Sequence, residues 1–272
     1  MKKIFVLVII TLVGSQLKAQ DAAEKKVQAG LVTGFGLNFQ KMGTKLIDND
    51  GVGNDLTIGA NVNFGLTETI GLCTGVEFDF ETTKFKAGPS PVYYRYNDTE
   101  LQTKADGADN QLFQLTTRKQ KATYITIPVM MIFRTKYIGY FRYFGKFGLR
   151  NSILVNSKLN DGGYNFSYDV NPVLEASNGD ISAASQDNMN AKGEMFIFKS
   201  AVGLAGGAEW NFVGSTCLVG EIGYYYGFTP LFNNRKDDKS YLFNTDALGT
   251  NPSYFSNKAT QGQLMLKLSI LF

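Results

Sequence analysis

Histidine is absent from this sequence of 272 residues. Without histidine the chain cannot form a Ser-His-Asp triad or a Cys-His pair, and it lacks the commonest protein ligand of transition metals. Its two cysteines, Cys73 and Cys217, allow at most one disulfide. These absences exclude many classes of enzyme, and we expect no catalytic residue, no cofactor and no bound metal.

Long apolar runs are absent as well, whereas a helix that spans a membrane needs about 20 apolar residues. Residues 4–13 form a short apolar run after Lys2 and Lys3, and polar and small residues follow as far as Ala19. This is the build of a secretory signal peptide. We therefore expect residues 1–19 to be removed, and the remaining domain, residues 20–272, to cross any membrane with strands.

An excess of charge of one sign is also absent. The net charge is only +3, and no basic stripe runs along the chain. We therefore expect no nucleic-acid partner. Glycine is plentiful, with 29 residues, aromatic side chains make up 13% of the chain, and proline is low at 6. This composition is typical of many strands joined by polar loops.

Apolar and polar residues alternate with a period of two in eight segments, which predicts eight strands with two different faces. The C-terminal segment is the clearest, because every second position from Leu264 to Phe272 is apolar. The predicted strands cover residues 29–40, 56–66, 70–81, 122–134, 139–155, 195–210, 216–228 and 264–272.

The connections between these strands alternate in length. The short ones are residues 67–69, 134–138 and 211–215, and the long polar ones are residues 41–54, 86–121, 156–194 and 229–261. With an even number of antiparallel strands, all short connections lie at one end and all long ones at the other. Short periplasmic turns and long extracellular loops in this arrangement are typical of outer-membrane barrels.

Alternation alone does not say which face meets lipid, since a soluble lipocalin-like barrel alternates with its apolar face inward. The polar face, however, carries charges of both signs, which can pair inside a narrow barrel. These predicted interior charges are Glu77, Asp79, Glu81, Glu209 and Glu221 with Arg142, Lys146, Arg150, Lys199 and Lys267. Aromatic residues also gather at strand ends, as they do at membrane interfaces. We predict an all-β, eight-stranded antiparallel transmembrane β-barrel, with the soluble barrel as the alternative.

The last strand resembles the C-terminal signal by which outer-membrane proteins engage the barrel-assembly machinery. Its matching residues are Leu266, Leu268, Ile270 and Phe272. The segment Thr126-Ile127-Pro128-Val129 is similar to an Ile-Pro segment in a middle strand of PorT-like small barrels, the outer membrane protein β-barrel domain family. The resemblance covers residues 20–272 and implies an outer-membrane location in a Gram-negative bacterium, with membrane lipid and the assembly machinery as partners. For some members it also implies a role in protein export by the type IX secretion pathway.

Two other features are candidates for metal or disulfide chemistry. Residues 48–55 are rich in oxygen ligands and glycine, as calcium loops are, but they lack the spacing and the distal Glu of an EF-hand. We interpret this run as a turn. Cys73 and Cys217 are expected on opposite sides of the barrel, too far apart for the Cα separation of about 7 Å that a disulfide tolerates, so we expect free thiols.

Aromatic clusters beside an arginine inside polar loops are typical of contact surfaces. The candidates are Tyr93, Tyr94, Arg95, Tyr96, Tyr241 and Phe243. The alternative is that these side chains pack the loops against one another.

Eight strands enclose an interior just wide enough for side chains. We therefore expect a non-enzymatic barrel that acts through its outer loops or through membrane partners, including other outer-membrane or secretion-system proteins. The alternatives are a small-solute channel or ligand-binding barrel, and a membrane enzyme acting on lipid, which the absence of histidine disfavours.

Overall fold

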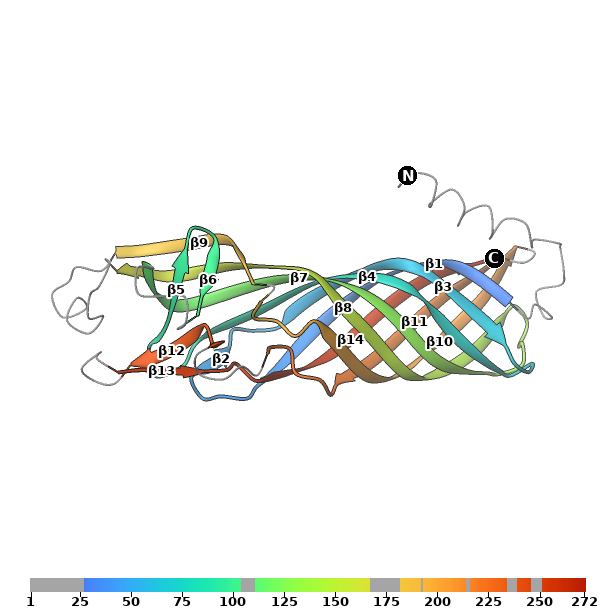
Figure 1. Ribbon diagram of the computed structural model, residues 1–272. Helices are drawn as coiled ribbons and strands as arrows, with labels where there is room; N and C mark the ends of the chain where they lie inside the picture. Colours follow the sequence, from blue (N-terminus) through green and yellow to red (C-terminus); the bar gives the residue numbers. More distant parts are fainter. Residues whose placement is uncertain are drawn as a thin grey trace.

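The computed structural model describes residues 27–103, 111–166, 182–191, 193–213, 216–233, 239–245 and 251–272. The predicted signal peptide lies outside the described residues. The described chain forms one sheet of fourteen strands, drawn in Figure 1. Among these residues, no helix has the length and apolar character needed to span a membrane.

The longer strands each pair antiparallel with two others, in an order that returns to its start. They are β1 (Val27–Met42), β3 (Gly53–Gly65), β4 (Ile70–Ala87), β7 (Gln111–Arg134), β8 (Phe141–Phe166), β10 (Phe198–Val213), β11 (Thr216–Gly227) and β14 (Ala259–Leu271). The pairings run β1–β3–β4–β7–β8–β10–β11–β14 and close from β14 to β1. Every backbone group of such a closed path can bond within the sheet, which is the condition for strands in lipid.

The shorter strands lie in the long connections. They are β2 (Ile47–Asn49), β5 (Val92–Asn97), β6 (Glu100–Gln102), β9 (Ser182–Asn190), β12 (Leu242–Thr245) and β13 (Pro252–Phe255). β5, β6 and β9 form a second closed path with β7 and β8, and β12 and β13 extend from β5. The prediction of eight strands is therefore too small for the whole sheet, because the connections predicted as polar loops carry strands of their own.

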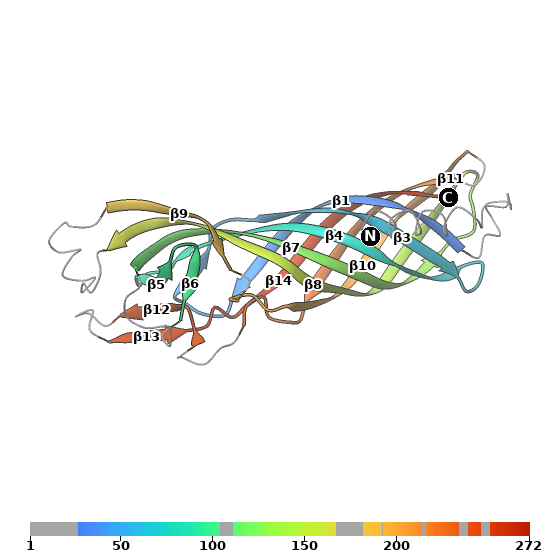
Figure 2. The same cartoon turned by 45° about the horizontal axis from the view of Figure 1, so that its top comes forward.

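β7 and β8 also extend much further than predicted, beyond the remaining strands of the main path (Figures 1 and 2). The register between them shifts between Leu115 and Thr117 and again between Thr123 and Tyr124. Each irregularity moves the apolar face out of phase with the alternation that precedes it. The alternation in the sequence is therefore interrupted at these points, and the predicted strands were too short.

The wall of the main path is apolar outside and polar inside. Outward-facing side chains such as Leu31, Leu204 and Leu268 are 64%, 66% and 60% exposed. A soluble barrel buries its apolar face, whereas a barrel in lipid exposes it to the acyl chains. The observed arrangement agrees with the predicted barrel whose apolar face meets lipid, and not with the lipocalin-like alternative.

The polarity inverts at the end where the long connections lie. There the shorter strands pack with residues 82–87 of β4, 111–124 of β7 and 154–166 of β8 around a buried apolar core; we call these elements and the described segments that join them the loop domain. The core includes Phe85, Tyr94, Phe113, Leu159 and Met189. The loop domain is thus folded like a water-soluble protein, while the wall below it is not.

Candidate functional site

All ten predicted interior charges lie on the inner face of the main path, and each is at most 8% exposed. Their side chains come from β4, β8, β10, β11 and β14, and they meet across the interior. Every one of them forms an ion pair with a charge of opposite sign. Buried charges are tolerated only when they are paired and hydrogen-bonded, so this network accounts for charges in a wall that faces lipid.

The centre of the network is Arg150. Its Nη2 donates to Glu77 Oε2 at 2.7 Å and to Asp79 Oδ2 at 2.9 Å. Lys267 Nζ donates to the same Glu77 at 2.6 Å, and the Thr57 hydroxyl donates to Asp79 at 2.6 Å. One guanidinium therefore joins two carboxylates that a second cation and a hydroxyl also bind.

Further ion pairs lie on both sides of this centre. Lys146 Nζ donates to Glu221 at 2.5 Å toward the short connections. Lys199 pairs with Glu81 toward the loop domain, where Gln263 also donates to Glu81 at 2.9 Å. Apolar residues fill the interior between the charged groups, around Met130 in one layer and Ile132 in another. The interior is thus closed by side chains along its length.

Two interior charges escaped the sequence analysis. Asp55 is fully buried next to Asp79 and Glu81, and it has no cationic partner among the described residues. Arg134 donates from Nε to Glu209 at 2.9 Å. Asp55 stands one position before the predicted strand 56–66 and was assigned to a connection. Arg134 is the last residue of the predicted strand 122–134 and the first of the predicted connection, and it was not listed as an interior charge.

The run of residues 48–55 does not surround one centre. Asp48 pairs with β4 in strand β2, Gly51 turns the chain with a φ of +90°, and Asp55 points into the interior. Asp55, Asp79 and Glu81 bring carboxylate oxygens within 4.8 Å of one another. Arg150 and Lys199 already neutralise two of these carboxylates.

Four of the six predicted contact residues are buried in the loop domain, which corrects the expectation that they form a surface. Tyr93, Tyr94, Tyr96 and Phe243 are at most 5% exposed, and only Arg95 and Tyr241 are half-buried. Tyr93 stacks on Phe243 at 5.9 Å between ring centroids, and burial raises the pKa of the Tyr94 hydroxyl. These aromatic rings pack the loops together, as the alternative interpretation holds.

A buried arginine in the same region also escaped the sequence analysis. Arg118 forms two hydrogen bonds with Asp161, at 2.8 and 2.7 Å, and donates to Glu194 at 2.9 Å. Its guanidinium lies over the rings of Phe85 and Tyr94. Burial alone would lower the pKa of Arg118, but the two carboxylates raise it above its usual value. Arg118 thus joins β7, β8 and the segment before β10.

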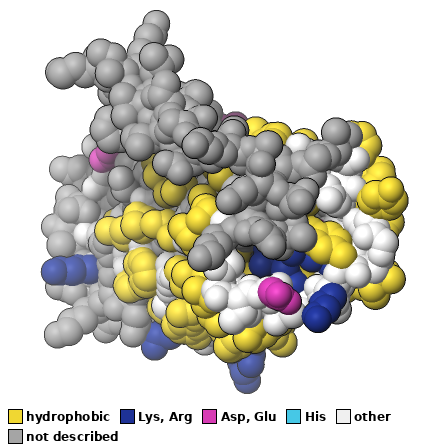
Figure 3. Space-filling view, turned by 90° about the vertical axis from the view of Figure 1, so that its right-hand side faces the viewer, with side chains coloured by type: hydrophobic (Ala, Val, Ile, Leu, Met, Phe, Trp, Pro, Cys, Tyr) yellow, Lys and Arg dark blue, Asp and Glu magenta, His cyan; other side chains and the backbone are white. Residues whose placement is uncertain are grey.

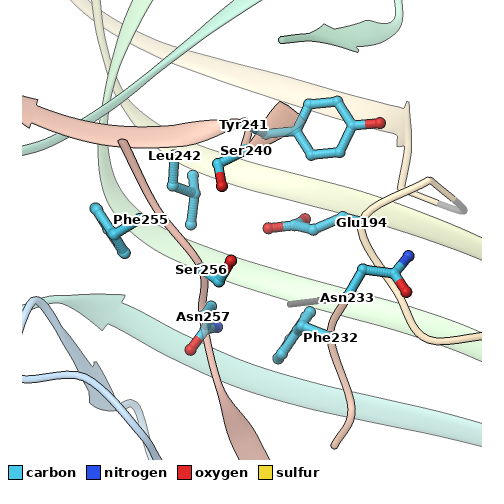
Figure 4. A pocket seen from close by; sticks show the side chains of 9 residues that line it. All are labelled: Glu194, Phe232, Asn233, Ser240, Tyr241, Leu242, Phe255, Ser256 and Asn257. Atoms are coloured by element: carbon cyan, nitrogen blue, oxygen red, sulfur yellow. The ribbon is translucent and has the colours of Figure 1, made fainter. Parts of the chain in front are cut away.

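The loop domain also has a pocket with about 260 Å³ of empty space, part of it open to solvent. Figure 4 shows its lining, which combines a carboxylate, hydroxyls and amides with aromatic rings. The residues are Glu194, Phe232, Asn233, Ser240, Tyr241, Leu242, Phe255, Ser256 and Asn257. Tyr241 is the one predicted contact residue in this lining.

The residues of the predicted assembly signal all face outward, three of them on β14 and Phe272 directly after it. Leu266, Leu268, Ile270 and Phe272 are between 43% and 60% exposed. β14 pairs with β1 and β11 and so joins the two ends of the chain. Cys73 and Cys217 are buried and form no disulfide.

The sequence matches the family model described as the outer membrane protein beta-barrel domain over residues 15–233. No curated protein matches the chain in sequence. Solved structures with a similar fold include OprG from Pseudomonas aeruginosa (11% identity, TM-score 0.42, 93% of this chain and 99% of that chain). Others are Ail of Yersinia pestis (10%, 0.35, 91% and 100%) and the outer membrane protease OmpT from Escherichia coli (9%, 0.33, 94% and 99%). At these values the similarity carries no inference about activity.

Arg150 and Asp55 provide a matched test of the interior network. Replacing Arg150 with Met leaves Glu77 and Asp79 without their shared cation, and we expect a loss of about 3–5 kcal/mol in the free energy of unfolding, as for other broken buried pairs. Replacing Asp55 with Asn removes a carboxylate that faces two others, so the free energy of unfolding should stay the same or rise. Urea unfolding of the protein in liposomes measures both, and a larger loss from Asp55→Asn than from Arg150→Met would contradict this account.

Proposed function

The chain belongs to the outer membrane protein β-barrel domain family, and from this premise we propose that it acts through the loop domain, outside the cell, rather than as a pore or an enzyme. The family places the chain in the outer membrane of a Gram-negative bacterium. In this proposal the main path is an eight-stranded wall that spans the membrane, after removal of residues 1–19. The short connections face the periplasm and the long ones face the medium, as is usual for outer-membrane barrels.

The observation that carries the proposal is the closure of the interior. Arg150 binds Glu77 and Asp79 across it, and apolar side chains pack around these charges. A solute that passed through the interior would have to separate buried ion pairs, each of which is costly to break. The absence of histidine supports a non-enzymatic role, because membrane enzymes of the kind considered above depend on it.

The loop domain has the properties of a binding module. Its core of aromatic rings and the Arg118 ion pairs hold the long connections in one arrangement. A folded loop region presents its surface with little loss of conformational entropy on binding. The pocket beside Tyr241 and Asn233 is the concave part of this surface that we consider first for a ligand.

A more specific form of the proposal is an accessory role in protein export. It is supported by the resemblance of the segment Thr126-Ile127-Pro128-Val129 to PorT-like barrels. Deleting the gene should then reduce the secretion and surface display of proteins exported by the type IX pathway. Unchanged secretion, with normal levels of other outer-membrane proteins, would contradict this form and leave the surface-binding role in place.

Conductance measurements test whether the interior is closed. We expect the purified protein to give no steady conductance in a planar lipid bilayer, because paired side chains fill the path. A stable, reproducible conductance would favour the alternative of a small-solute channel. Insertion is verified on the same sample by the resistance of the folded barrel to unfolding in detergent.

Cysteine labelling tests on which side the loop domain lies. Lys119 in the loop domain and Lys136 in a short connection are both exposed. With a membrane-impermeant maleimide on intact cells, Lys119→Cys should be labelled and Lys136→Cys should not, while both are labelled after the outer membrane is permeabilised. The wild-type protein is the control, because its two cysteines are buried. The reverse pattern would place the loop domain in the periplasm.

A further inference from the structure

The buried charges of the main path balance in number but not along its length. Acids and bases are equally numerous: Asp55, Glu77, Asp79, Glu81, Glu209 and Glu221 against Arg134, Arg142, Lys146, Arg150, Lys199 and Lys267. Near the loop domain, the buried carboxylates of Asp55 and Glu81 lie together, and Lys199 forms an ion pair with Glu81. At the end with the short connections, Arg134 and Arg142 share the single carboxylate of Glu209. The buried side chains at this end therefore carry one positive charge in excess.

The guanidinium groups at this end are not fully bound by the protein. The side chain of Arg134 is 6% exposed, and its Nη2 atom is buried without a hydrogen-bond partner in the part of the chain that the structure describes. Gln28 accepts a hydrogen bond from Arg142 at 3.4 Å, but its own Nε2 is buried and unpartnered among the same residues. A buried donor without an acceptor is costly, and a charged one more so.

An apolar layer lies directly behind these groups. Ile132, Phe144, Val219 and Leu271 are at most 6% exposed and form one cluster with Cys217. The layer separates the two arginines from the next ion pair, Lys146 with Glu221. A group bound by the arginines would therefore stop at the mouth and could not continue into the interior. Figure 3 looks onto this end, where basic side chains and an acidic one are visible among hydrophobic ones.

We propose that the mouth at the short connections is a binding site for an oxyanion of the phosphate type, held by Arg134 and Arg142. Guanidinium groups present planar pairs of donors that match the oxygens of phosphate and carboxylate. A bound oxyanion supplies the missing negative charge and accepts from Arg134 Nη2. Glu209 keeps both arginines in place through their Nε atoms. Arg142 Nη2 also donates to Gln28, and Arg134 Nη2 is left for the ligand. The phosphate is either a free ion or the headgroup of a phospholipid in the adjacent leaflet.

Calorimetric titration of inorganic phosphate into the full protein, purified in a detergent without phosphate, tests the site. We expect saturable binding that weakens about tenfold in Arg134→Gln, the loss of one charge-assisted hydrogen bond. Arg134→Lys should bind with an intermediate affinity, because it keeps the charge and loses the planar pair of donors. Lys119→Gln, an equal change of charge in the loop domain, is the matched control and should bind as the wild type does. Unfolding curves show that each variant is folded.

A second titration identifies the source of the phosphate group. Micelles doped with phosphatidylglycerol should abolish the binding of free phosphate if a lipid headgroup occupies the site, and should leave it unchanged if the ligand is a soluble ion. Either result supports the oxyanion site. Absence of binding from both sources, or equal binding by wild type and Arg134→Gln, would overturn the proposal.

Discussion

The ion pairs around Arg150 allow this wall to face lipid on one side and to be closed on the other. An apolar outer face leaves the polar residues of each strand no place but the interior, and a narrow interior leaves no bulk water to solvate them. Arg150, Glu77 and Asp79 resolve this conflict by binding one another from β8 and β4. Lys267 of β14 and Lys199 of β10 form ion pairs of the same kind with Glu77 and Glu81 of β4. The closure of the wall and the lack of an open path therefore follow from one set of contacts.

The apolar side chains of one strand point outward in the wall and inward in the loop domain. Along β7, Val129 and Phe133 face outward and are exposed, whereas Phe113 and Leu115 point inward and are buried. The first pair lies where the surroundings are lipid, and the second lies in the loop domain, where only burial removes apolar surface from water. Arg118 is the polar centre of that domain, as Arg150 is of the wall. The wall and the loop domain, each with its own interior, thus share β4, β7 and β8.

Much of the wall could be predicted from the sequence because the period of a strand is local. Alternation assigned the ten predicted interior charges to one face and their mixed signs assigned that face to the interior, where the structure places all ten. Asp55, Arg134 and Arg118 were missed, since the first two stand where alternation ends and the third lies in a connection read as a polar loop. An extra residue at Thr116 in β7 and another at Val155 in β8 change the phase of the alternation, so the parts of these strands in the loop domain do not continue the pattern of the wall.

Alternation, the lengths of the connections and the apolar C-terminal strand determined by themselves which residues share a face and that the chain folds as a barrel in a membrane. Only the tertiary structure decided which charges meet. Arg150 binds Glu77 across 73 positions of sequence, and Lys267 binds it across 190. Such partners depend on how far each strand is displaced along its neighbour when the sheet closes. That displacement is a property of the whole ring and is not encoded in any single strand.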